Sequence, residues 1–422
     1  MTEKDKTRLR NLAGTYAEYA LGEPMAQRRE KWRRHNRRQE KTFPFHIEDN
    51  GSYFRDLVAP LECEDAECRA LEGRLLHVLT AYEKIDDDRI VPDRVVVDWC
   101  TPSTGVCDEL RITRADNGRG DTRGYATNHP IQDIDADFGK LKKTAIRLDR
   151  EASERRLHVV EEAFSGLLPV EAGRCGSAYS IGITNKAVHL MGMQELYLQM
   201  GMNPGAVHRL FAFLAEDNME TGRWEEEQGL LTSNHDGNQG YCTGSSLFSD
   251  ETEPPAGRAV RATDCYGYLE SQESAGISPA MFEEFVLPYL APLAARFKFL
   301  MYGCCEAVHH LMPSLLRLHG LRKVSVTPWC DLDVLTKTCP TDIIWCRKPV
   351  PLLLCGDTFS EATLRDHLQE TLDMGRDYFI EFVYRDTDRL TGAMADRVAT
   401  TCAMIRELTG HPEGSRGEEK RK

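Results

Sequence analysis

Two cysteines and a glutamate stand next to one another in the segment Cys304-Cys305-Glu306. On an extended chain Cys304 and Glu306 would face the same way, and Cys305 would join them only where the backbone turns. Gly303, directly before them, makes such a turn possible. Thiolate and carboxylate ligands, together with a histidine such as His235, suit Zn²⁺ at a catalytic site with an open position. The alternative is two buried thiols and a glutamate that begins a helix.

Other polar or aromatic side chains follow several short apolar runs that we expect to be strands. They are Asn234 and His235 after 229–233, Glu270 and Glu273 after 266–269, Trp329 and Asp331 after 324–326, Lys348 after 343–345, and Asp386 after 379–383. In a parallel barrel all these strand ends lie on one face, where active sites are built. The side chains are therefore expected to converge on one cavity for a small-molecule substrate.

The residue types indicate a role for each group in that cavity. We expect charge or proton transfer from Glu273, Asp331, Lys348 and Asp386. We expect substrate contacts from Tyr302, Trp329, Asn234 and Glu270, and metal ligation by Cys304, Cys305, Glu306 and His235. Structural alternatives stay open: Asp331 as a helix cap, Lys348 in solvent, Asn234 and His235 in an ordinary polar loop, and Glu270 and Glu273 at a helix entry.

The elements that must position these groups are short apolar strands that alternate with helices. We expect strands at 42–48, 94–99, 167–172, 229–233, 265–269, 297–302, 323–326, 342–345 and 378–383. Helical patterns occur at 7–21, 25–39, 63–83, 150–166, 187–200, 204–227 and 278–296, the last interrupted by Pro288 and Pro292. Buried strands that alternate with helices predict a parallel sheet, and about eight of them predict a closed α/β barrel.

Three parts of the chain are set apart by their composition. Residues 1–41 are predicted as a basic, helical N-terminal extension, and 42–410 as the barrel. Residues 101–140 are rich in Gly, Asp, Asn and Thr and are predicted as an irregular insertion that could contain a hairpin. Residues 411–422 are predicted to be disordered.

The overall composition limits the class of protein. A net charge of −14 argues against a nucleic-acid binder, which needs clustered Lys and Arg. The sequence contains no run of 18 apolar residues, so we expect no membrane span. The polar N-terminal segment is unlike a signal peptide, so we expect a cytoplasmic protein whose 14 cysteines are reduced. A homodimer is compatible with the sequence.

The order of motifs resembles the uroporphyrinogen-decarboxylase-like superfamily. The resemblance is carried by LESQESAGISPAMFEEFVLPY at 269–289, FLMYGCCE at 299–306, VSVTPWCD at 324–331 and RKPVP at 347–351. It is strongest over residues 265–406 and traceable over about 40–260. The Tyr-Gly-Cys-Cys-Glu segment is typical of one subgroup. The resemblance implies a distorted (β/α)₈ TIM barrel.

Members of this superfamily include decarboxylases and zinc-dependent methyltransferases that work with corrinoid proteins. The Arg-rich substrate motif of the decarboxylases does not occur here, and the first strand instead contains Phe45-His46-Ile47-Glu48. Cys304 matches the family cysteine of the methyltransferases, Tyr302 replaces their histidine, and Tyr384-Arg385-Asp386 stands where their later cysteine would be. The departures leave the ligand set open.

The resemblance therefore implies zinc-dependent methyl transfer with methylcobalamin, or another corrinoid, carried by a partner protein. One alternative is decarboxylation of uroporphyrinogen or another carboxylated substrate. A second is a non-catalytic protein that binds a corrinoid or tetrapyrrole.

Overall fold

The computed structural model is described here for all residues except 49–50, 116–123, 174–178, 236–247, 254–255 and 411–422. Its centre is a seven-stranded sheet in the order β1-β11-β10-β9-β8-β7-β6, in which all neighbouring strands are parallel. The strands are β1 (Phe45–Ile47), β6 (Ser180–Ile181), β7 (Tyr266–Leu269), β8 (Phe299–Tyr302), β9 (Leu321–Val326), β10 (Ile344–Arg347) and β11 (Ile380–Tyr384). The carboxyl ends of these strands therefore lie on one side.

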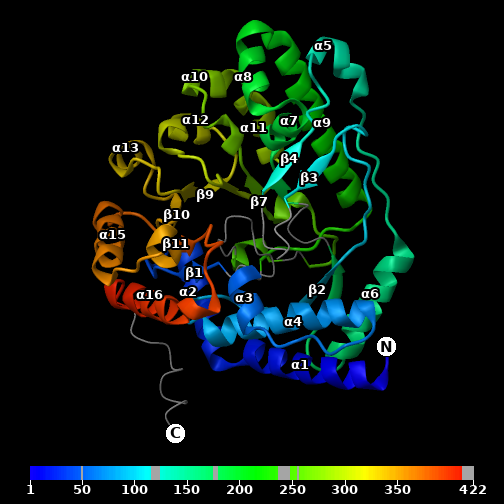
Figure 1. Cartoon of the computed structure of the whole chain (residues 1–422), viewed down its shortest axis with the longest axis vertical. Helices are drawn as coiled ribbons and strands as arrows, with labels where there is room; N and C mark the ends of the chain where they lie inside the picture. Colours follow the sequence, from blue (N-terminus) through cyan, green and yellow to red (C-terminus); the bar gives the residue numbers. More distant parts are fainter. Residues whose placement is uncertain (49–50, 116–123, 174–178, 236–247, 254–255, 411–422) are drawn as a thin grey trace.

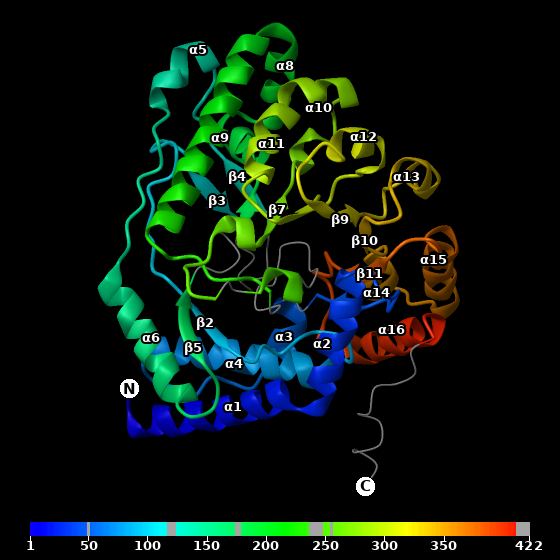
Figure 2. The ribbon, with the colours of Figure 1, turned by 180° about the vertical axis from the view of Figure 1, so that it is seen from behind.

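Helices surround the strands, as Figures 1 and 2 show. In the C-terminal half they are α10 (Pro279–Phe285), α11 (Leu287–Ala294), α12 (Met312–Leu315), α13 (Leu332–Thr338), α14 (Leu352–Cys355), α15 (Glu361–Met374) and α16 (Ala395–Leu408). Before them come α7 (Ile183–Met191), α8 (Met193–Met202) and α9 (Pro204–Glu227). Among the described helices, none is both long and apolar enough to cross a membrane.

The N-terminal helices form a second packed layer. Helix α1 (Glu3–Leu21) packs on α4 (Ala66–Lys84) and α6 (Arg150–Phe164), and α2 (Glu23–Asn36) continues from it after Gly22. The same layer contains β2 (Val95–Asp98) and β5 (Val170–Gly173), a separate parallel pair. Leu9, Leu75 and Val97 belong to its apolar core. The short helices α3 (Gly51–Leu57) and α5 (Ile134–Asp137) and the hairpin β3–β4 (Ile112–Arg114, Tyr125–Thr127) complete the fold.

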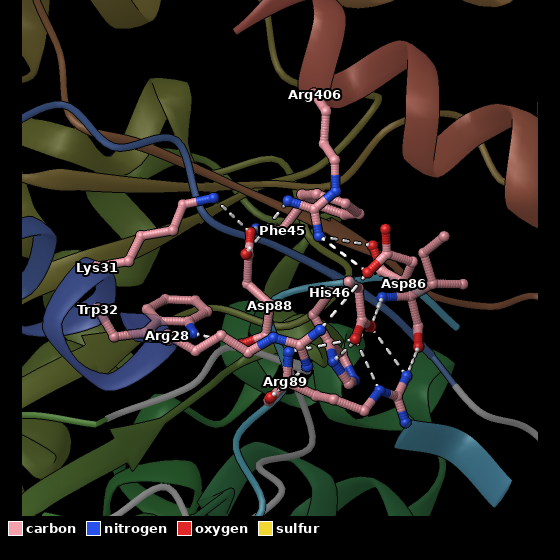
Figure 3. A network of polar contacts seen from close by, with 11 residues as sticks. Arg28, Lys31, Trp32, Phe45, His46, Asp86, Asp88, Arg89 and Arg406 are labelled. Atoms are coloured by element: carbon pink, nitrogen blue, oxygen red, sulfur yellow. Dashed lines mark hydrogen bonds and ion pairs between the residues drawn. The ribbon is translucent and has the colours of Figure 1, made fainter. Parts of the chain in front are cut away.

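Within the described residues, side chains rather than a neighbouring strand bind the edge of β1 that faces away from β11. The backbone N–H groups of Phe45 and Ile47 donate to the carboxylates of Asp88 at 3.0 Å and Asp87 at 2.9 Å. Asp88 also accepts a hydrogen bond from Lys31 at 2.7 Å (Figure 3). Buried backbone donors must find partners, and these carboxylates supply them where the strand pairing stops.

The two faces of the main sheet carry different side chains because successive residues of a strand point to opposite sides. Most strand residues face the large outer core, among them Phe45, Ile47, Tyr302 and Trp345. The inner face is lined by a smaller cluster that contains Tyr266, Tyr268, Met301, Cys346 and Val383, with Cys304 packed against it. The inner face thus leads directly to the cysteine pair.

The inner face also holds a fully buried ion pair. Lys323 of β9 donates to Glu381 of β11 over 2.6 Å, and neither side chain is exposed to solvent. Removing one partner would leave the other charge buried without its oppositely charged partner, which is costly. The pair therefore fixes how β9 and β11 face one another across β10.

Most of the predicted elements are confirmed. Helix α9 has the predicted bounds, the 278–296 helix is broken into α10 and α11, and the insertion contains a hairpin. The helix predicted at 187–200 is divided between α7 and α8 at Gly192, whose φ of 83° ends the first helix. The strand predicted at 229–233 is reduced to a single β-bridge residue, Leu231, and the side chain of Asn234 pairs with the backbone of β7.

Barrel closure stays a prediction. In the described part of the chain, no strand pairing joins the seven-stranded sheet to β2 and β5. Arg94, directly before β2, forms an ion pair with Glu171 of β5, and its guanidinium donates to the carbonyl of Ser233 over 2.6 Å. The tail predicted to be disordered at 411–422 lies outside the described residues.

Replacement of Lys323 by Met should lower the free energy of unfolding by about 3–5 kcal/mol, because the buried Glu381 loses its oppositely charged partner. The double variant Lys323→Met/Glu381→Met should recover most of this loss. Chemical denaturation of both variants measures the effect. Equal destabilisation of single and double variants would contradict the role given to the pair.

Candidate functional site

The cysteine pair lies at a sharp bend directly after β8. Gly303 has a φ of 98°, a value that L side chains rarely adopt, and a Cβ there would lie 3.1 Å from Val308 and 3.2 Å from Ser325. The bend brings the Sγ atoms of Cys304 and Cys305 to 3.5 Å from one another. The predicted turn at Gly303 is confirmed, and it places both thiols together.

The carboxylate of Glu306 turns back toward the backbone of the site. It accepts the N–H of Cys304 at 2.8 Å and the N–H of Ser271 at 3.3 Å. Burial raises the pKa of Glu306, although these backbone hydrogen bonds act in the opposite direction. Glu306 therefore joins the ends of β7 and β8.

Two side chains hold the backbone carbonyl of Cys304. The Ser325 hydroxyl of β9 donates to it at 2.8 Å, and the ammonium of Lys348, which follows β10, donates to it as well. Lys348 is almost completely buried. The bend at Cys304 is thus bound by groups from two neighbouring strands.

The ends of β11 and β1 also carry charged groups, one of which contacts a thiol. The carboxylate of Asp386 lies 3.9 Å from the sulfur of Cys305. The N–H of Asp386 donates to the carboxylate of Glu48 at 2.8 Å. The guanidinium of Arg385 lies 3.5 Å from this Glu48 carboxylate. Sequence reasoning missed Glu48, although it stands directly after the first strand.

A narrow cleft opens beside the exposed thiol. It is lined by Cys305, Thr327, Pro328, Trp329, Lys348, Pro349, Pro351, Arg385 and Asp386. Trp329, which lines this cleft, is 71% exposed to solvent. Asp331 lies in solvent and accepts the N–H of Val334 at 3.0 Å, so it acts as the predicted cap of α13 (Leu332–Thr338). A substrate contact for Trp329 and charge or proton transfer by Asp331 stay predictions.

The end of β7 carries a pair of acidic side chains. Glu273 accepts hydrogen bonds from Thr184 and Asn185 of α7, both at 2.8 Å. Glu270 accepts the N–H of Gln272 at 3.0 Å. Burial, followed by the charge of Glu273, raises the pKa of Glu270 to about 8, so this group is a neutral acid at pH 7.

The three remaining predicted residues have packing or backbone partners. Tyr302 is fully buried in the outer core, and its phenol meets the Ser271 hydroxyl. The amide of Asn234 pairs with the backbone of Tyr266 in both directions, at 2.7 and 2.9 Å. His235 shares a 3.0 Å hydrogen bond with Ser233. Substrate contacts for Tyr302 and Asn234 and metal ligation by His235 stay predictions.

The local field favours a thiolate at Cys304. The hydrogen bond from Cys305 lowers the pKa of Cys304 to about 6, burial opposes this shift, and the positive charges of Lys348 and Arg385 support it. The same hydrogen bond between the two cysteines is the main cause that raises the pKa of Cys305, and burial is the second. One sulfur of the pair is therefore ionised at neutral pH, and the other carries the proton between them.

The described residues do not assemble a complete zinc ligand set. In the chain as described, no three His, Cys, Asp or Glu side chains are grouped so that they could hold a metal ion. Catalytic zinc requires three protein ligands, whereas Glu306 is bound to backbone N–H groups and the two thiols provide only a pair. The zinc prediction stays a prediction, and the arrangement itself offers a nucleophilic sulfur.

Comparison with known proteins adds one structural likeness. No protein-family model and no curated protein matches this sequence. The chain is similar to a solved methyltransferase from Methanosarcina mazei, at 14% sequence identity and a TM-score of 0.42, over 75% of this chain and 80% of that one. This likeness assigns no activity to the chain. The family resemblance of the sequence motifs therefore stays a prediction.

The pH dependence of Cys304 alkylation should show its lowered pKa. The rate with iodoacetamide should rise through a midpoint at about pH 6, because only the thiolate reacts. Cys305→Ala should move the midpoint upward, because the main cause of the lowered pKa is removed. Peptide mass mapping measures the rate at this residue. A wild-type midpoint near the ordinary thiol value of 9.0 would contradict the proposed field.

Glu270→Gln should stabilise the protein more at pH 8 than at pH 5. The folded state raises the pKa of Glu270 from 4.5 to about 8. Below pH 4.5 the side chain is protonated in both the folded and the unfolded state, so it does not destabilise the fold. As pH rises toward 8 only the unfolded state ionises freely, and the folded state loses stability. Gln keeps an oxygen for the N–H of Gln272 and cannot ionise. Thermal denaturation at both pH values should show a gain in Tm larger by about 2–5 °C at pH 8. A gain independent of pH would contradict the raised pKa.

Proposed function

We propose that this protein is an enzyme that transfers a methyl group, with the thiolate of Cys304 as the atom that receives the methyl carbon. The observation that carries the proposal is the sulfur pair at 3.5 Å, with a cleft beside its exposed member. We infer that the transferred group is methyl from the sequence resemblance of the Tyr-Gly-Cys-Cys-Glu segment to the methyltransferase branch.

The step is a displacement at carbon. A sulfur lone pair of Cys304 forms the bond to the methyl carbon, and the bond between that carbon and its O, N, S or metal leaving atom breaks. The electron pair leaves with that atom. Lys348 and Arg385 favour the thiolate before attack. Glu270 is neutral at pH 7, so it adds no negative charge that would repel the nucleophile.

The product of this step is a thioether, which releases a methyl group only to a strong nucleophile. We propose the corrinoid of a partner protein as that acceptor, in agreement with the sequence resemblance. Exposed Trp329 beside the cleft is a suitable contact for such a partner, because exposed tryptophans often anchor interfaces. Zinc enters no step of this scheme.

Methylcobalamin is the probe for this function. Incubated anaerobically in the dark, the protein should run this second step in reverse. Cys304 should take one methyl group as the carbon–cobalt bond breaks and leaves its electron pair on cobalt as Co(I), with loss of the methylcobalamin absorption bands. Peptide mass spectrometry locates the modification. Cys304→Ser should abolish it, whereas Cys339→Ser should not, because Cys339 is a buried thiol near the start of β10.

Unchanged methylcobalamin and unmodified Cys304 would overturn the proposal. Conversion of uroporphyrinogen by the same preparation would favour the decarboxylase alternative. A spectral shift of added cobalamin without methyl transfer would favour the non-catalytic binding protein. Zinc bound in stoichiometric amount and lost in Cys304→Ser would restore the metal mechanism.

A further inference from the structure

His46 lies on the face of the sheet that leads to the cysteine pair. Its strand neighbours Phe45 and Ile47 are buried in the outer core, so the alternation of the strand turns His46 to the inner face. It stands opposite Val383 of β11, a member of the inner cluster on which Cys304 packs. The His46 side chain is 21% exposed.

Asp87 holds the imidazole from the free edge of β1. Its Oδ2 lies 3.3 Å from Nδ1 of His46 and also accepts the N–H of Ile47 at 2.9 Å. Arg89 donates to the other oxygen at 2.7 Å. Burial alone would raise the pKa of Asp87, but the charge of Arg89 and the hydrogen bond to His46 hold it well below its usual range. The fully buried carboxylate therefore stays ionised and keeps a proton on Nδ1.

This arrangement determines which nitrogen is available. With Nδ1 donating to Asp87, the second ring nitrogen Nε2 is the one that exchanges a proton with a ligand. In the described part of the chain, Nε2 of His46 makes no hydrogen bond to protein. Figure 3 shows His46 within the network of Asp86, Asp88 and Arg89 that fixes this edge of β1. His35, by contrast, is completely buried.

We propose that His46 is the acid–base residue of the Cys304 site and that Asp87 is its positioning residue. This rests on the proposed function, because methyl transfer to Cys304 leaves a basic O, N or S atom on the donor. His46, in the form with both ring nitrogens protonated, gives its Nε2 proton to that atom as the carbon–heteroatom bond breaks and returns to the Nδ1–H form. In the reverse direction its Nε2 takes the proton back. The proposal assigns the methyl donor to the class whose leaving atom needs a proton, such as an ether or an amine.

The first test asks whether His46 and Cys304 share one cavity. Diethyl pyrocarbonate, which acylates accessible neutral imidazoles, should modify His46 and the exposed His319 but not the buried His35. Prior alkylation of Cys304 with N-ethylmaleimide should reduce modification of His46 to the level of His35 and leave His319 unchanged. If His46 is modified to the same extent with and without alkylation of Cys304, the proposal is overturned.

The second test asks which ring nitrogen carries the proton. Nitrogen NMR of ¹⁵N-histidine-labelled protein, with His46→Asn for assignment, should show the Nδ1–H form. Asp87→Asn should shift the ring toward a mixture of tautomers, which a merely structural carboxylate would not do. A wild-type ring protonated only at Nε2 would overturn the proposal.

Both tests are independent of methyl transfer. If Cys304 takes no methyl group from methylcobalamin while His46 behaves as expected, the proposed function fails, and the pairing of His46 with Asp87 in the cavity of Cys304 is still supported. If Cys304 is methylated while His46 is inaccessible or has the other tautomer, the function stands and this inference fails.

Discussion

The parallel alignment of β1, β11, β10, β9, β8 and β7 is the constraint on which the rest of this structure depends. Parallel strands place all their carboxyl ends on one side, so residues far apart in the sequence meet there. Lys348 and Asp386, from the ends of two different strands, contact the cysteine pair, and Glu48, from a third, accepts the N–H of Asp386. The buried ion pair of Lys323 and Glu381 links β9 and β11 on the inner face of the sheet.

The chemistry of the site follows from how tightly its backbone is held. Gly303 permits the bend, Ser325 and Lys348 bind the carbonyl after it, and Glu306 binds the N–H of Cys304. These contacts fix the two sulfurs close together in a positive field. The result is a low-pKa thiolate whose protonated neighbour donates a hydrogen bond to it. A nucleophile held in this way needs little rearrangement to react.

The free edge of β1 combines a structural and a chemical property. Asp87 and Asp88 satisfy backbone donors that a neighbouring strand would otherwise bind. Because Asp87 is buried and ionised, the same carboxylate also fixes the orientation of His46. Edge strands are commonly protected by charged groups, and here the protection produces a histidine–carboxylate pair on the inner face.

Local patterns in the sequence determined the α/β class, the strands β7 to β11, helix α9, the interrupted helix before β8 and the turn at Gly303. They did so because alternation, helical periodicity, proline and glycine act within a few residues. Only the tertiary structure decided that Glu306 binds backbone N–H groups, that Lys348 holds the carbonyl of Cys304, and that Tyr302 faces the outer core. It also brought Asp87 to His46. Such contacts depend on register and on the packing of distant segments, which no local pattern records.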